Sequence, residues 1–204
     1  MPGFVAVSLV SGALELYQPI MEVGLPLWII EHTKAPASLN ALLLVLNTAC
    51  VVLLQTALSR GADSAQGGAR LQQRAGLLLA AACLLFAVSH WGRATIAAPI
   101  LVVGMLLLSI GELAQSAGGY ALSFELPPPG QQGAYQGVFA LGRGLQQSVG
   151  PVLVTGLAIG VGPLGWVVLA GLFFVLAMLC RPLAAHVERT RDTDRHEAAD
   201  RSRL

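Results

Sequence analysis

The chain has 204 residues, of which 55% are hydrophobic and only 11% are charged, and its mean hydropathy is +0.69. Soluble domains carry about 25% charged residues, so most of this protein's surface must face something other than water. The net charge of +1 lacks the basic excess of a nucleic-acid-binding protein, and we expect no nucleic-acid partner. The composition is that of an integral membrane protein whose first partner is the lipid bilayer.

Six apolar stretches can cross a bilayer as helices. A hydrocarbon core of about 30 Å needs about 20 apolar residues, and a helix satisfies its own backbone in lipid. In chain order the expected spans are residues 4–30, 39–58, 75–90, 96–122, 134–159 and 164–180. We expect residues 1–185 to form one all-α transmembrane domain and the charged residues 186–204 to form a disordered cytoplasmic tail.

Polar and turn-forming residues separate the expected spans. The stretch 59–74 contains three glycines and three arginines and is expected to be a polar loop before the third span. Shorter breaks are expected at Pro36, at His90–Arg93, at Pro127–Gly130 and at Gly160–Pro163.

Basic residues gather on one side of this topology. The loop after the second span carries Arg60, Arg70 and Arg74, and six further arginines follow position 180. The opposite loops carry only Lys34 and Arg93. Basic loops stay in the cytoplasm, so with an even number of spans we expect both termini to be cytoplasmic and the protein to lie in the cell membrane.

Ionisable residues within the spans are the strongest functional signal. They are Glu15 and Glu22 in the first span, Glu112 in the fourth and Arg143 in the fifth. Charge in a bilayer is costly and usually serves a binding site or a proton pathway. The structural alternatives are an acid that joins two helices by hydrogen bonds, or an arginine that reaches the membrane interface.

Two spans carry their polar residues on one helical face. The first span has Ser8, Ser11, Glu15, Gln18 and Glu22, and the fourth has Ser109, Glu112, Ser116, Gly119 and Ser123. Steps of three and four residues share one stripe of a helix, so these helices are expected to line a common cavity. From the rise of about 1.5 Å per residue, we expect Glu15, Glu112 and Arg143 to meet near the midplane, with Glu22 further out.

The fifth span has two distinct faces. Its small residues are expected to pack closely on another helix: Gly133, Gly137, Gly144 and Ser148. Its polar face carries Gln136, Arg143 and Gln147. The expected cavity residues are therefore Glu15, Gln18, Glu22, Glu112, Ser116, Arg143 and Gln147.

The six spans fall into two similar triplets. The first and fourth carry polar stripes, the second and fifth are mixed, and the third and sixth are almost wholly apolar. A three-helix unit used twice in opposite orientations is the pattern of inverted repeats in secondary transporters. We expect the third and sixth spans to lie at the lipid-facing periphery.

Five segments then carry a family resemblance. They are Leu25-Pro26-Leu27-Trp28, Arg60-Gly61-Ala62-Asp63 with Arg70, Gly111-Glu112, Leu126-Pro127-Pro128 with Gly133 and Tyr135-Gln136-Gly137, and Gly150-Pro151. They resemble, in order, the outer end of the seventh helix, the basic loop motif, a pair in the tenth helix, and the start and the bend of the eleventh helix of Major Facilitator Superfamily transporters. The loop segment lacks the usual Asp-Arg pair, and Gln132 stands where the family often has Arg.

The resemblance covers residues 4 to about 191 and implies the C-terminal six-helix half of a twelve-helix transporter, most similar to the bacterial drug:proton antiporter branch. It implies proton-coupled efflux of small amphipathic or cationic compounds, with Glu112 or Glu15 carrying the proton. Three intramembrane acids against one arginine favour a cationic or neutral cargo. The expected partner is a second six-helix half or a second copy of the chain; the alternative is a non-transporting fragment or accessory half.

Enzymatic alternatives lack their residues. His32 and His90 lie at span ends, no His-Glu-x-x-His pattern occurs, and no glycine-rich loop precedes a Lys-Ser or Lys-Thr pair. The three cysteines are dispersed in apolar runs. We expect no enzyme activity, no metal and no cofactor.

Overall fold

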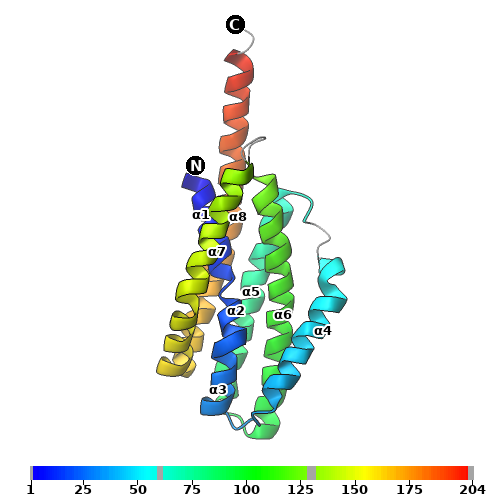
Figure 1. Cartoon of the computed structure of the whole chain (residues 1–204), viewed down its shortest axis with the longest axis vertical. Coiled ribbons are helices and arrows are strands. Elements are labelled where there is room, and N and C mark those ends of the chain that lie inside the picture. The colour runs from blue at the N-terminus through cyan, green and yellow to red at the C-terminus, as the bar shows by residue number, and fades with distance from the viewer. Residues whose placement is uncertain (1, 59–61, 128–131, 202–204) are drawn as a thin grey trace.

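In a computed structural model that describes residues 2–58, 62–127 and 132–201, every regular element of those residues is a helix. Six helical segments are long and apolar enough to cross a membrane: Gly3–His32, Leu39–Thr56, Ala65–Ser89, Ala94–Glu125, Gln132–Val161 and Pro163–Thr190. The all-α architecture and the six spans are therefore confirmed, and the pattern is that of a multi-pass membrane protein. The first and last helices lead to the same end of the bundle (Figure 1).

The first span is interrupted. It consists of α1 (Pro2–Leu14), the short turn α2 (Tyr17–Pro19), the wide π-helical turn η1 (Ile20–Gly24) and α3 (Leu25–His32). At the first break the amides of Glu15 and Leu16 donate to carbonyls three residues earlier, whereas an α-helix uses the carbonyl four residues earlier. Glu15 therefore lies at a joint in a membrane-spanning segment.

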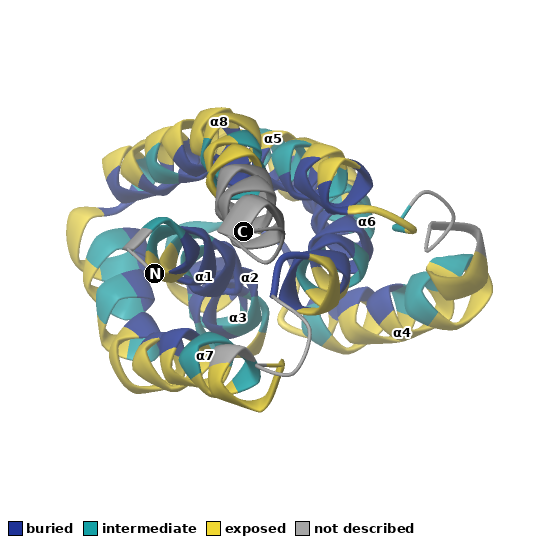
Figure 2. Ribbon diagram, turned by 90° about the horizontal axis from the view of Figure 1, so that it is seen from above, coloured by how far each residue is buried: buried dark blue, intermediate teal, exposed yellow. Residues whose placement is uncertain are grey.

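The remaining helices pack around this span. They are α4 (Leu39–Leu58), α5 (Ala65–Ser89), α6 (Ala94–Glu125), α7 (Gln132–Thr155), η2 (Gly156–Val161) and α8 (Pro163–Arg201). Seen from above, α5 and α8 form one side of the bundle, α1 and α6 lie in the middle, and α4 and α7 flank the opposite side (Figure 2). Helix α5 packs on α6 and α8, α8 also packs on α1, α4 packs on α6, and α7 packs on α1.

An aromatic cluster ties three spans together at the end opposite the termini. The indole Nε1 of Trp28 donates to the carbonyl of Phe86 at 3.0 Å and to Oγ of Ser89 at 3.1 Å. The ring of Trp166 packs against Trp28 and Phe86, with centroids 5.7 and 5.2 Å apart. All three rings are fully buried, so they hold α3, α5 and α8 in a fixed relation.

The third span begins earlier than expected. We expected a polar loop up to residue 74, but α5 begins at Ala65, where the Ser64 side chain caps the helix by accepting from the Gly67 amide at 3.1 Å. The next turn packs on α6 at glycines: a Cβ on Gly68 would lie 2.9 Å from the Gly118 carbonyl oxygen. Small residues that look like loop residues in sequence are here a helix contact. Residues 59–61 of the expected loop, Arg60 among them, lie outside the described residues.

Two further expectations differ from the structure. The third span was expected at the lipid-facing periphery. In α5, however, 56% of an apolar 18-residue stretch is buried, whereas in α4 the corresponding share is 17%. The charged residues after His186 were expected to be disordered, but α8 continues to Arg201. A nucleated helix extends at little cost through good helix formers such as Ala, Glu and Arg.

Candidate functional site: a polar cavity around Glu15 and Arg143

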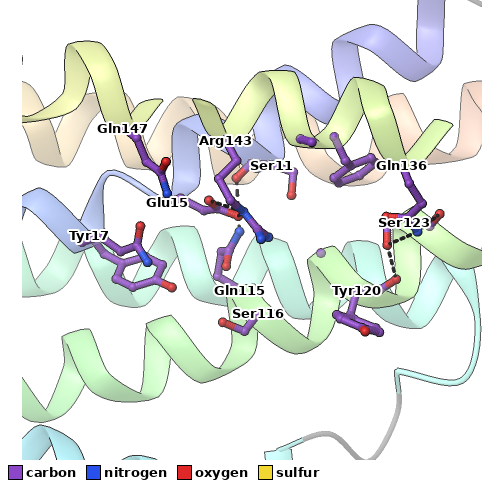
Figure 3. Close-up of a pocket in the computed structure, with 14 residues that line it drawn as sticks. Ser11, Glu15, Tyr17, Gln115, Ser116, Tyr120, Ser123, Gln136, Arg143 and Gln147 are labelled. Carbon is purple, nitrogen blue, oxygen red and sulfur yellow. Dashed lines mark hydrogen bonds and ion pairs between the residues drawn. The ribbon is translucent and has the colours of Figure 1, made fainter. Parts of the chain in front are cut away.

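A polar cavity of about 410 Å³ lies between the first, fourth and fifth spans (Figure 3). Amides, hydroxyls and one ion pair dominate its wall, which is formed by Ser11, Glu15, Tyr17, Gln18, Gln115, Ser116, Gly119, Tyr120, Ser123, Gln136, Phe139, Ala140, Arg143 and Gln147. Five of the seven predicted cavity residues are among them. The structure therefore brings the polar stripe of the first span together with the polar face of α7.

An ion pair lies at the centre of this cavity. Nε of Arg143 donates to both carboxylate oxygens of Glu15, at 3.0 and 3.2 Å. The Glu15 side chain is 10% exposed and the Arg143 side chain is 62% exposed. The two terminal amino groups of Arg143 have no hydrogen-bond partner among the residues that the structure describes. The carboxylate is thus shielded, and the charge that the cavity presents is the arginine's.

Backbone contact between α1 and α7 positions the pair. A Cβ on Gly12 would lie 2.8 Å from the carbonyl carbon and oxygen of Gly142, and one on Gly142 would lie 2.9 Å from the Ser8 carbonyl oxygen. Glycine at both positions lets the helices touch, which places Arg143 beside Glu15. The small residues of α7 that we expected to pack on another helix do not make this contact. A Cβ on Gly133, Gly137 or Gly144 would meet nothing within 4 Å.

Glutamine side chains complete the framework of the cavity. Nε2 of Gln146 donates to the Glu15 carbonyl at 3.1 Å, at the break in the first span. Gln72 and Gln115 donate to Oγ and the carbonyl of Ser11, at 2.6 and 3.2 Å. The sequence analysis did not single out these three glutamines, although an amide in an apolar span is itself a signal that it needs a partner.

Glu112 does not join Glu15 and Arg143, contrary to expectation. Its Oε2 accepts from Nδ2 of Asn47 on α4 at 2.8 Å, and the same nitrogen donates to Oγ of Ser109 at 3.1 Å. A second, more apolar cavity of about 550 Å³ between α4 and α6 contains Glu112. Ser116 and Tyr120 line both cavities, and Tyr17 is close enough to both acids to interact with the charge of each.

Glu22 lies in a third place. It is exposed and lines a cavity of about 350 Å³ between η1, α3 and α4. The three intramembrane acids therefore belong to three different cavities, and only Glu15 is beside the arginine.

Comparison of the chain with protein-family models, curated proteins and solved structures gives no match. The function has to be inferred from the geometry of the cavities and of the bundle.

Proposed function

We propose that this chain is a six-helix unit of a proton-coupled secondary transporter in the cell membrane. One observation carries the proposal: a shielded carboxylate, Glu15, pairs with Arg143 of another span inside a polar cavity, at a break in a membrane helix. Intramembrane ion pairs and interrupted helices are typical of ion and substrate pathways. In this proposal Glu15 binds and releases the proton, and Arg143 is its counter-charge.

The helix pairings support an inverted repeat. In an inverted repeat the first, second and third spans (α1, α4 and α5) correspond to the fourth, fifth and sixth (α6, α7 and α8). The helix contacts can therefore be compared after exchanging each span with its counterpart. The contact of α5 with α6 then becomes that of α8 with α1, and the contact of α4 with α6 becomes that of α7 with α1. The contact of α5 with α8 is unchanged. Each of these pairings therefore has its counterpart, as two copies of one three-helix unit require.

The placement of charge supports the proposed orientation. Arg70 and Arg74 lie in the first turns of α5, and Arg181 and Arg189 lie in the second half of the last span, Pro163–Thr190. These helix ends lie where the two termini of the chain also lie (Figure 1). By the positive-inside rule this end is cytoplasmic.

The open face of the bundle supports a partner of the same kind. Helix α7 forms one wall of the polar cavity, α4 packs on α6, and these two are the least buried spans. The small residues Gly133, Gly137 and Gly144 of α7 have no neighbour here, although such residues usually mark close helix contacts in membranes. We propose that a second six-helix unit, or a second copy, closes the cavity from this side.

For the Glu15 cavity, the expectation of an amphipathic or cationic cargo is supported only by the family resemblance. The charge count that favoured a cation combined three acids, and the structure separates them. Glu112 and the mainly apolar wall around it are where such a compound fits better.

Proton movement in sealed vesicles tests the proposal without a known cargo. Vesicles containing the chain, or two copies joined in tandem, are given cationic, neutral and anionic aromatic compounds while the internal pH is followed. We expect at least one compound to drive proton movement that Glu15→Gln abolishes and that Glu31→Gln, an exposed acid at the end of α3, leaves intact. If inserted, folded protein gives no Glu15-dependent movement in either arrangement, the accessory, non-transporting unit is the better interpretation.

A further inference from the structure

We infer that the Glu15–Arg143 cavity binds a small organic anion, with an aromatic carboxylate as the simplest example, and that one proton binds with it. This inference rests on the proposed transport function for its biological purpose. Its binding step is independent of transport and is tested separately below.

The exposed edge of Arg143 is the first argument for an anion. Glu15 engages only Nε, and the side chain of Arg143 lines the cavity and is 62% exposed. Its two terminal amino groups form the fork that holds a carboxylate by two parallel hydrogen bonds. Glu15 cannot attract a cation equally well, because its side chain is 10% exposed and already neutralised.

The remainder of the wall suits an aromatic body with polar substituents. Tyr120 on α6 is 70% exposed and Phe139 on α7 lines the same cavity, so both can contact an apolar ring. Gln18 and Gln147 line the same cavity and add amide donors and acceptors. The volume of about 410 Å³ lies within the range of about 300–1,000 Å³ of small-molecule sites.

Charge balance gives the coupling to a proton. The Glu15–Arg143 pair is neutral as it stands, and a bound anion adds one negative charge in a cavity lined by three membrane spans. Protonation of the Glu15 carboxyl, by a proton from water, restores neutrality while Arg143 stays paired with the anion. Two O–H bonds change: one breaks in a hydronium ion, which becomes water, and one forms on the Glu15 carboxyl.

Few other ionisable groups face the pair. Tyr17 on α2 and Tyr120 on α6 line the cavity, and Glu112 on α6 is close enough to Tyr17 to interact with it electrostatically. No ionisable side chain of α5 or α8 is among the described residues of the cavity wall. Glu15 is therefore the acid expected to take the proton.

Three probes of one shape and different charge test the ligand class. Benzoate, benzamide and benzylammonium are measured by equilibrium dialysis against the full chain in lipid nanodiscs. We expect benzoate to bind at least tenfold more tightly than the other two. Where binding takes up one proton, linkage requires the affinity to fall tenfold for each unit of pH rise.

Substitutions then assign the two roles. Arg143→Gln is expected to weaken benzoate binding at least tenfold. Arg143→Lys, which keeps the charge and the partner of Glu15 but loses the fork, is expected to weaken it several-fold and guards against a folding defect. Glu15→Gln is expected to keep benzoate binding and lose its pH dependence, and Glu31→Gln, at the exposed end of α3, is expected to keep both.

The opposite results overturn the inference. They are equal or tighter binding of benzamide or benzylammonium, no benzoate binding by folded protein, unchanged benzoate binding by both Arg143 variants, or an unchanged pH dependence in Glu15→Gln. Glu15-dependent proton movement in vesicles together with absent benzoate binding would remove this inference and leave the transporter proposal standing. Benzoate binding without any proton movement would do the reverse.

Discussion

Removing the two partners of the Glu15–Arg143 pair should affect stability unequally. Losing one partner of a fully buried pair costs about 3–5 kcal/mol, whereas exposed pairs contribute only about 0–1 kcal/mol. Glu15 is 10% exposed and Arg143 is 62% exposed, so Arg143→Gln leaves a shielded carboxylate and Glu15→Gln leaves a guanidinium that already meets solvent. We expect Arg143→Gln to cost about 1–3 kcal/mol near neutral pH, between those two limits, and Glu15→Gln to cost less than about 1 kcal/mol.

Thermal unfolding in nanodiscs, followed by tryptophan fluorescence, measures this difference. For a domain of this size about 1 kcal/mol corresponds to about 2–4 °C in Tm, so Arg143→Gln should lower Tm by several degrees more than Glu15→Gln. Equal losses in the two variants, or a larger loss in Glu15→Gln, would refute the reasoning that the acid is the shielded partner.

Three other substitutions test contacts described above, each by its change in Tm. Gly12→Val should cost about 1–3 kcal/mol by overpacking, because its Cβ would lie 2.8 Å from the α7 backbone, whereas Gly144→Val, with open space, should be neutral; equal losses would exclude this crossing. Ser64→Ala removes the cap of α5 and should cost about 1 kcal/mol, and no loss would place the start of α5 later. Asn47→Ala frees Glu112 and should cost under about 2 kcal/mol, since hydrogen bonds between membrane helices contribute about 0.6 kcal/mol on average; a larger loss would make this contact a structural anchor.

The sequence predicts the meeting of Glu15 and Arg143 because both lie at similar depths on polar faces. It fails for Glu112, which shares a face of α6 with Gly119 but lies two turns earlier. Helices cross at angles, so one face of a helix has different neighbours at different levels. On this face of α6, Gly119 lies near Ser11 of the first span, whereas Glu112 contacts Asn47 of α4. Periodicity defines which residues share a face, whereas the neighbour of that face at each level is a property of the whole bundle.

The start of α5 was missed for a related reason. Composition treats Gly68 as a loop residue, but it is needed because the Gly118 backbone of α6 lies directly against it. Single-residue propensity cannot include a contact with a segment fifty residues away. Pro19, Gly24 and Pro26 do indicate from sequence that the first span can bend, but they do not fix the position of the break at Glu15.

The π-helical turn η1 (Ile20–Gly24) makes the chemistry of the cavity depend on a residue count. A π-helical turn holds more residues than an α-helical turn. The number of residues in η1 therefore sets how far the segment before it is rotated about the helix axis relative to α3. One residue in an α-helix corresponds to about 100° of rotation. Deleting Met21 or Val23 from this turn would therefore keep every side chain that lines the polar cavity and turn Glu15 away from Arg143.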